Sequence, residues 1–157
     1  MTDEQRKRIV NEVLSWKGTR YAGHSAVKGK LGGVDCAQLV HRTFTASGVV
    51  SPDIMAIPTD YKLSAQQHKT DSIYRDEVTK YFQEIPESEV RPGDLILYKP
   101  RGWHEYGHAA IVVSWPDNVI HATARYGVTG SHGIKHPFLL GAEKKFYTLK
   151  PEMVTEE

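Results

Sequence analysis

Cysteine is almost absent from the sequence: Cys36 is the only one among 157 residues. A single cysteine excludes an intrachain disulfide, and it excludes a zinc site built mainly from cysteine thiolates. Long apolar runs are also missing, and none approaches the roughly 20 residues that a membrane-spanning helix needs. The N-terminal residues are polar from the start, so we expect neither a membrane span nor a secretory signal peptide.

Net charge is equally scarce, because 20 lysines and arginines oppose 19 aspartates and glutamates. Without a basic block, nothing in the charge favours binding to nucleic acid or to an acidic membrane surface. Hydrophobic residues make up 39% and charged residues 25%, which is typical of a folded globular chain. This length and composition predict one domain over residues 1–157. Because we expect no signal peptide, we also expect the protein to be cytoplasmic as synthesised.

The sequence pattern places helices first and strands afterwards. Helical spacing of apolar residues predicts helices over 3–17, 36–46 and 71–82. Strand patterns bounded by proline, glycine and asparagine predict strands over 94–98, 109–114, 118–122, 127–134 and 145–149. Consecutive strands with short connections indicate an α+β domain, in which N-terminal helices pack on a central antiparallel β-sheet.

Cys36 stands at the predicted start of the second helix, directly after a Gly-Gly-Val-Asp segment. The unpaired N–H groups and the positive dipole end at such a position stabilise a thiolate. A structural cysteine would more naturally lie in the middle of the helix, beside Leu39 and Phe44. The position favours a reactive thiol and leaves a buried structural cysteine as the alternative.

Two histidines lie on consecutive predicted strands. His108 opens the apolar run at 109–113, and His121 lies near the end of the next strand. Antiparallel pairing predicts that they are cross-strand neighbours on one face of the sheet. A thiol, an imidazole base and a second polar group that orients the base form the set needed for nucleophilic catalysis. The same three side chains also ligate zinc, so a zinc-binding module is an alternative.

Five short segments, taken in order, resemble the NlpC/P60 cysteine peptidases of the papain-like superfamily, and more closely their bacteriophage and mobile-element branch. These segments are Gly18–Tyr21, Val34–Cys36, Arg91–Ile96, Gly107–Val112 and Val119–Ala122. The resemblance implies a papain-like α+β fold and hydrolysis of peptide bonds in bacterial peptidoglycan, without a cofactor or metal. The family's typical target is the bond between D-γ-glutamate and the following diamino acid.

Residue by residue, the resemblance implies that Cys36 is the nucleophile, His108 the general base and His121 the third member of a triad. Tyr21 matches a tyrosine that lines the site and helps to stabilise the oxyanion. Asp35 matches an acidic residue that helps to bind the free amino group of the stem peptide. The structural alternatives are a tyrosine at the edge of the core for Tyr21 and a helix N-cap for Asp35.

The sequence departs from the family pattern after the nucleophile, where Ala37-Gln38 replaces the Ser-Gly of many members. We expect no second, wall-binding domain. We therefore also expect a delivery or tail-assembly partner, and action at the cell wall after non-classical delivery or release. We expect Trp103, His104 and Tyr106 to line the groove. The remaining alternatives are a CHAP-like amidase and a catalytically silent phage structural protein. In CHAP enzymes the residue after the first catalytic histidine in the triad is usually Asn, Asp or Glu. This chain has His121 in that place, which favours the NlpC/P60 family.

Overall fold

The centre of the fold is a six-stranded antiparallel sheet. The computed structural model describes residues 1–23, 25–55, 69 and 73–155. The strand order is β3-β8-β4-β5-β6-β7. In chain order these strands are β3 (Phe82–Ile85), β4 (Leu95–Lys99), β5 (His108–Ser114), β6 (Asn118–Thr123), β7 (Gly127–Ser131) and β8 (Glu143–Leu149).

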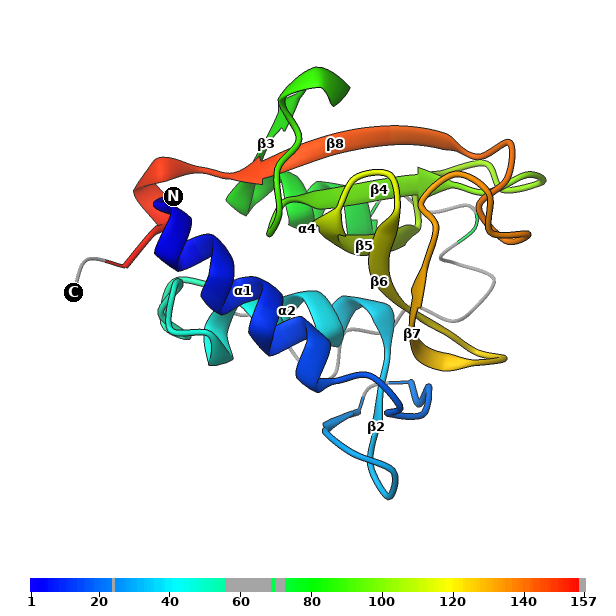
Figure 1. Ribbon diagram of the computed structural model, residues 1–157, viewed down its shortest axis with the longest axis horizontal. Helices are drawn as coiled ribbons and strands as arrows, with labels where there is room; N and C mark the ends of the chain where they lie inside the picture. Colours follow the sequence, from blue (N-terminus) through cyan, green and yellow to red (C-terminus); the bar gives the residue numbers. More distant parts are fainter. Residues whose placement is uncertain (24, 56–68, 70–72, 156–157) are drawn as a thin grey trace.

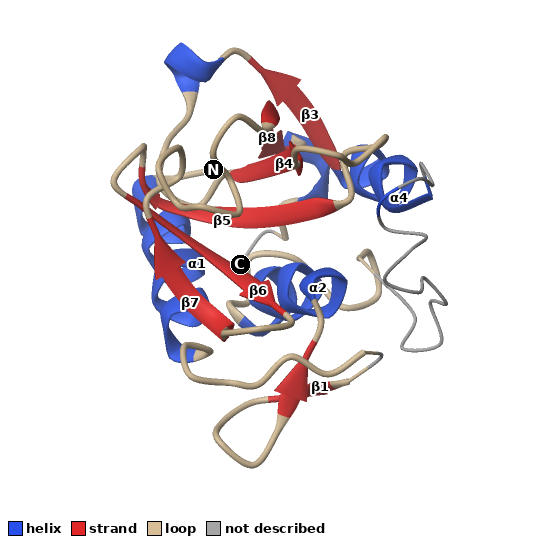
Figure 2. Cartoon of the chain, turned by 90° about the vertical axis from the view of Figure 1, so that its right-hand side faces the viewer, coloured by secondary structure: helices blue, strands red, loops and turns tan. Residues whose placement is uncertain are grey.

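Helices α1 (Asp3–Ser15) and α2 (Cys36–Ala46) lie side by side against one face of this sheet (Figure 1). Helix α4 (Ile73–Tyr81) leads directly into β3 at the opposite edge of the sheet from β7. A two-stranded hairpin, β1 (Ala26–Val27) and β2 (Gly33–Val34), projects beside α2 (Figure 2). Short 3-10 helices occupy Glu87–Glu89 and Pro151–Met153. The predicted α+β architecture is therefore confirmed.

The sequence explains where both long helices begin. The Oγ1 of Thr2 accepts a hydrogen bond from the backbone N–H of Gln5, and the Gln5 side chain accepts one from the N–H of Thr2. This capping box satisfies two N–H groups that the first turn of α1 leaves unpaired. Asp35 caps α2 in the same way, because its Oδ1 accepts from the N–H of Gln38 at 2.8 Å. Cys36 consequently becomes the first residue of α2.

Two hydrophobic clusters bury both faces of the sheet. The cluster beneath the helices includes Ile9, Val13, Leu39, Phe44, Leu95, Ile111 and Ile120. The cluster on the opposite face includes Ile96, Tyr98, Val112, Val119, Leu139 and Phe146. Because β4 and β5 are covered on both sides, their sequences read as continuous apolar runs rather than as an alternation.

Most predicted elements are confirmed with shifts of a few residues at their ends, and α2 has the predicted bounds. The sequence pattern missed β3, because its middle residues Gln83 and Glu84 are polar and exposed. It also missed the hairpin of β1 and β2, whose two-residue strands are too short to show a periodicity. The predicted loop over 51–70 and the start of the helix predicted over 71–82 fall mostly outside the described residues. No helix in the described part of the chain is long and apolar enough to cross a membrane.

A buried carboxylate joins the first helix to the sheet. Asp94, which has no exposed surface, accepts hydrogen bonds from the Arg6 guanidinium at 2.9 Å and from the Thr148 hydroxyl at 2.7 Å. Its second oxygen accepts from the backbone N–H of Arg91 at 2.9 Å. These contacts connect α1, the turn before β4 and strand β8. Because of these contacts, the Arg-Pro-Gly-Asp segment at residues 91–94 has a structural role.

Replacing Asp94 with alanine leaves the buried Arg6 charge without its partner. We expect the free energy of unfolding to fall by about 3–5 kcal/mol, as for other broken buried ion pairs. Denaturant unfolding followed by circular dichroism measures this change. The matched control is Asp3→Ala, which removes an exposed ion pair with Arg91 and should cost less than about 1 kcal/mol. Equal losses in the two variants would contradict the role assigned to Asp94.

Candidate active site

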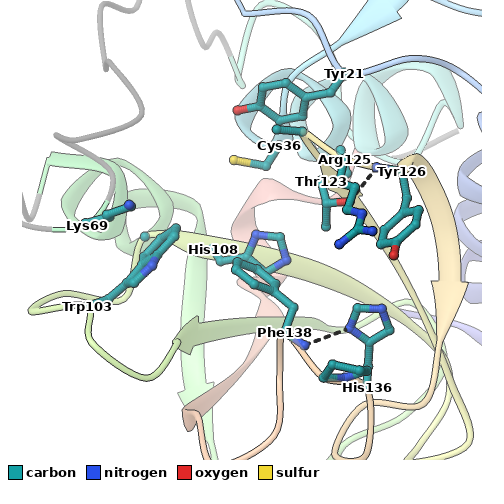
Figure 3. A pocket seen from close by; sticks show the side chains of 14 residues that line it. Tyr21, Cys36, Lys69, Trp103, His108, Thr123, Arg125, Tyr126, His136 and Phe138 are labelled. Atoms are coloured by element: carbon teal, nitrogen blue, oxygen red, sulfur yellow. Dashed lines mark hydrogen bonds between the residues drawn. The ribbon is translucent and has the colours of Figure 1, made fainter.

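Cys36 lies where the N-terminus of α2 meets the sheet, at the end at which β5 begins and β6 finishes. Its side chain is 4% exposed and lines a cavity of about 730 Å³. In Figure 3, Tyr21 and Cys36 lie on one side of this cavity and His108 lies across from them. Three of the five residues predicted for the site therefore meet in one cavity.

The position of Tyr21 follows from backbone pairing on both sides of it. Gly18 and Thr19 exchange hydrogen bonds with Val128 of β7, while Arg20 accepts one from the N–H of Val34. Gly127 makes the first of these pairings possible, because any side chain there would collide with the Thr19 carbonyl. Its φ of +68° is also a conformation that favours glycine. The Gly-Thr-Arg-Tyr segment thus holds Tyr21 at the mouth of the cavity.

His108 and His121 form a direct side-chain pair. The Nε2 atom of His108 lies 2.8 Å from the Nδ1 atom of His121 in a buried hydrogen bond. His108 is 4% exposed and His121 has no exposed surface. Because Nε2 of His108 faces His121, Nδ1 is the nitrogen through which His108 would act as a base toward the thiol. The predicted contact between the two histidines is confirmed, and their roles as base and orienting partner stay predictions.

The pairing of β5 and β6 refines the predicted contact. Ile111 faces Ile120 across the two strands, and the same register places Ala110 opposite His121. His108, two residues before Ala110, is therefore a diagonal neighbour of His121 on the same face of the sheet. The prediction of a shared face is confirmed, and the contact is diagonal rather than directly across.

The far side of His121 is also hydrogen-bonded, because its Nε2 lies 2.9 Å from the Oγ of Ser131 on β7. Burial, together with the charge of the nearby His136, lowers the pKa of His121 to about 4. A histidine with so low a pKa is neutral at pH 7. His121 therefore contacts His108 as an uncharged imidazole. No motif pointed to Ser131, which lies ten residues after His121 on the edge strand.

The thiol of Cys36 differs from its expected state. Burial and the Asp35 carboxylate raise its pKa to about 12, and these effects outweigh the backbone N–H groups of Cys36 and Ala37, which lower it. The predicted position at a helix start is confirmed, but burial and the Asp35 carboxylate favour the neutral thiol over the predicted thiolate. A neutral thiol that shares a cavity with His108 could act as a nucleophile only if its proton moved to a base during attack.

Tyr21 and Asp35 occupy different places relative to the cavity. Burial, followed by the charges of Cys36 and Asp35, raises the pKa of Tyr21, so its hydroxyl stays a hydrogen-bond donor at neutral pH. Asp35 is buried as the N-cap of α2 and is not among the residues that line the described cavity. The structural alternative for Asp35 is thus realised, and its role in binding an amino group stays a prediction.

Aromatic side chains build the wall beside the base. The ring of Phe138 packs edge-on against His108 at 4.9 Å between centroids, and Trp103 packs against Phe138 at 5.9 Å. Trp103 lines the cavity as predicted, whereas His104 and Tyr106 are not among its described lining residues. Tyr106 instead donates a hydrogen bond to Glu143. Phe138 was not predicted, because it lies in a turn-rich segment without a motif.

Among the remaining lining residues, Lys69 and Arg125 give the cavity positive charge. The others are Gly107, Ala122, Thr123, Ala124, Tyr126, His136 and Pro137. Figure 3 shows Lys69 and Arg125 on opposite sides of the Cys36–His108 pair. No aspartate or glutamate of the described residues lines the cavity. The cavity is therefore suited to a ligand that carries carboxylates.

The histidines are joined to each other rather than gathered around a common point. Within the described ranges, no group of three histidine, cysteine, aspartate or glutamate side chains is placed to hold a metal ion. The hydrogen bond between the two rings occupies one nitrogen of each, and Ser131 engages the second nitrogen of His121. This geometry favours proton transfer over metal ligation.

Comparison with known proteins identifies the family. Residues 14–138 match the NlpC/P60 family, and the chain belongs to it. No curated protein matches the chain significantly. The bacteriophage branch inferred from the sequence stays a prediction.

Solved structures show the same fold at low sequence identity. RipD from Mycobacterium tuberculosis, described as a non-catalytic NlpC/p60 domain protein adapted to peptidoglycan binding, has a TM-score of 0.57 at 15% identity. The match covers 94% of this chain and 98% of RipD. NlpC1 from Trichomonas vaginalis has a TM-score of 0.57 at 17% identity, over 98% of this chain but only 44% of NlpC1.

The peptidoglycan hydrolase RipB from Mycobacterium tuberculosis has a TM-score of 0.52 at 17% identity, with 94% of this chain and 67% of RipB covered. The chain thus spans less than half of the Trichomonas protein and about two thirds of RipB. These likenesses establish the NlpC/P60 fold.

Removing the negative charge of Asp35 should make Cys36 more reactive. In Asp35→Asn the N-cap is kept, because asparagine caps helices as well as aspartate does. The pKa of Cys36 falls once the carboxylate that raises it is gone. We expect iodoacetamide to alkylate the variant several-fold faster than the wild type at pH 8, where the thiolate is the reacting form.

The single cysteine makes the mass increase of the intact protein an unambiguous measure of this rate. Asp53→Asn, an exposed aspartate outside the cavity, is the matched control and should react at the wild-type rate. An Asp35→Asn protein that reacts no faster than this control would show that Asp35 does not hold the thiol protonated.

Proposed function

We propose that this protein is a cysteine hydrolase that cleaves peptide bonds in peptidoglycan stem peptides, with the D-γ-glutamyl–diamino acid bond as its target. The observation that carries the proposal is the chain of contacts at one end of the sheet. A thiol at a helix start and a buried base share one cavity, and a neutral histidine orients the base. The NlpC/P60 family, to which the chain belongs, supplies the substrate class.

Acylation begins when the sulfur of Cys36 attacks the amide carbonyl carbon while its proton passes to Nδ1 of His108. The oxyanion accepts hydrogen bonds from the backbone N–H of Cys36 and from the Tyr21 hydroxyl. When the intermediate collapses, the C–N bond breaks and the His108 imidazolium gives its proton to the leaving amine. An acyl group then remains on Cys36 as a thioester.

Deacylation uses the same groups in the opposite order. Water enters where the amine has left and transfers a proton to His108 as its oxygen attacks the thioester. The C–S bond then breaks, the new carboxylic acid departs, and the sulfur recovers its proton from His108. The high pKa of the Cys36 thiol suits this cycle, because it favours the return of the proton from His108 to the sulfur at the end of the cycle.

The charge of the cavity supports an acidic substrate. A D-γ-glutamyl bond leaves the α-carboxylate of the glutamate free, so the acyl part of the substrate carries a negative charge beside the scissile amide. Lys69 and Arg125 supply positive charge on either side of the nucleophile. We infer that one of these cations pairs with this carboxylate, and that Asp35 attracts the free amino group further along the stem peptide.

RipD shows why the fold by itself does not establish catalysis, since that protein is described as non-catalytic. A peptidoglycan-binding protein without activity is therefore the second candidate function. The intact thiol–imidazole–imidazole arrangement favours the hydrolase, because binding alone would not need a base held in one orientation. The proposal also includes a single catalytic domain over residues 1–157 and a delivery or tail-assembly partner. It further includes action at the cell wall after non-classical delivery.

The test is digestion of purified peptidoglycan peptides followed by mass spectrometry of the products. We expect the wild type to release fragments that end in D-γ-glutamate. Cys36→Ala should reduce turnover by about 10³-fold or more while the fold is kept, because alanine is tolerated at a helix start. His121→Ala should be milder, about 10- to 100-fold in kcat, since an orienting residue contributes less than the nucleophile.

Circular dichroism of both variants verifies that the fold is unchanged. Turnover by Cys36→Ala at the wild-type rate would refute the nucleophile. Peptidoglycan binding by a wild-type protein that leaves every peptide intact would instead establish the non-catalytic function.

A further inference from the structure

The series of hydrogen bonds at the site continues past His121 to a hydroxyl group that takes no part in the proposed mechanism. Ser131 lies on the edge strand β7, and its Oγ is 2.9 Å from Nε2 of His121. The groups that face His121 are His108 through Nδ1, Ser131 through Nε2, and the ring of His136 at 5.4 Å between centroids. Ser131 is the group that contacts the second nitrogen.

When both imidazoles are neutral, as proton transfer from the thiol to His108 requires, their contact allows two directions of hydrogen bonding. In the first, Nε2–H of His108 donates to Nδ1 of His121, and Nε2–H of His121 donates to Ser131. In the second, Ser131 donates to Nε2 of His121, and Nδ1–H of His121 donates to Nε2 of His108.

Only the first direction permits the proposed chemistry. It places the proton of His108 on Nε2 and leaves Nδ1 as a lone pair that accepts the thiol proton. The second direction puts a proton on Nδ1 of His108, so that two donors face each other at the nucleophile. The tautomer of His121 therefore decides whether His108 acts as a base.

We propose that Ser131 is a positioning residue, whose hydroxyl accepts the Nε2 proton of His121 and thereby keeps His108 in the tautomer that accepts the proton of Cys36. The proposal rests on the cysteine hydrolase function proposed above and extends its triad by one hydroxyl. Removal of Oγ leaves a buried N–H of His121 without its acceptor, which favours the opposite tautomer. The effect reaches the base without any contact between Ser131 and the substrate.

Ser131→Ala tests this role, with Ser131→Thr as the conservative variant that keeps the Oγ atom. We expect kcat for peptide cleavage to fall about tenfold in Ser131→Ala with KM within twofold of the wild type. Ser131→Thr should restore kcat to within about threefold. Ser114→Ala, which removes an exposed hydroxyl from the end of β5, is the matched control and should behave as the wild type. An unchanged kcat in Ser131→Ala, or a loss that threonine does not restore, overturns the proposal.

Nitrogen-15 NMR of histidine-labelled protein at pH 7 provides a readout that does not depend on activity. In the wild type, Nε2 of His121 should carry the proton and Nδ1 should be bare; in Ser131→Ala the proton should move to Nδ1. Identical tautomers in both proteins would overturn the role of Ser131 even if the protein is a hydrolase. A wild type that cleaves no peptide but shows the tautomer change would refute the hydrolase function and leave the role of Ser131 standing.

Discussion

The buried hydrogen bond between His108 and His121 is the interaction on which the whole site depends. It joins neighbouring strands through side chains that have almost no contact with solvent, so an error in register would break it. Because burial keeps His121 neutral, the bond transmits orientation and tautomer rather than charge. The sheet, with apolar clusters on both faces, holds His108 in the wall of the cavity that Cys36 of α2 also lines, while His121 is buried beside His108.

Cys36 combines two opposing influences. The helix start offers N–H groups that favour a thiolate, while burial and the Asp35 cap favour the thiol more strongly. One residue, Asp35, thus caps the helix that presents Cys36 and, after burial, also raises the pKa of its thiol. In the proposed reaction a base that is fixed in orientation is then essential, since the thiol must lose its proton during the attack. This dependence links the histidine pair to the state of the cysteine.

The sequence predicted the parts of the fold that leave a local or periodic signal. The bounds of α2 followed from Asp35 and an apolar helical stripe, and the histidine pair followed from two strands joined by a short turn. The polar strand β3 and the acceptor Ser131 left no such signal, because only tertiary pairing gives them a role. The raised pKa of the Cys36 thiol was not predicted, since burial depends on what the rest of the chain packs over it.

The central claim is that Cys36 attacks a γ-glutamyl carbonyl with His108 as its base. An alanyl-γ-D-glutamyl diazomethyl ketone, which presents this carbonyl to the nucleophile, tests it most directly when the labelled protein is analysed by mass spectrometry. We predict one equivalent bound to Cys36 of the wild type and no labelling of His108→Ala under the same conditions. Labelling of the His108→Ala protein at the wild-type rate, or a wild type that iodoacetamide alkylates but this peptide does not, would contradict the claim.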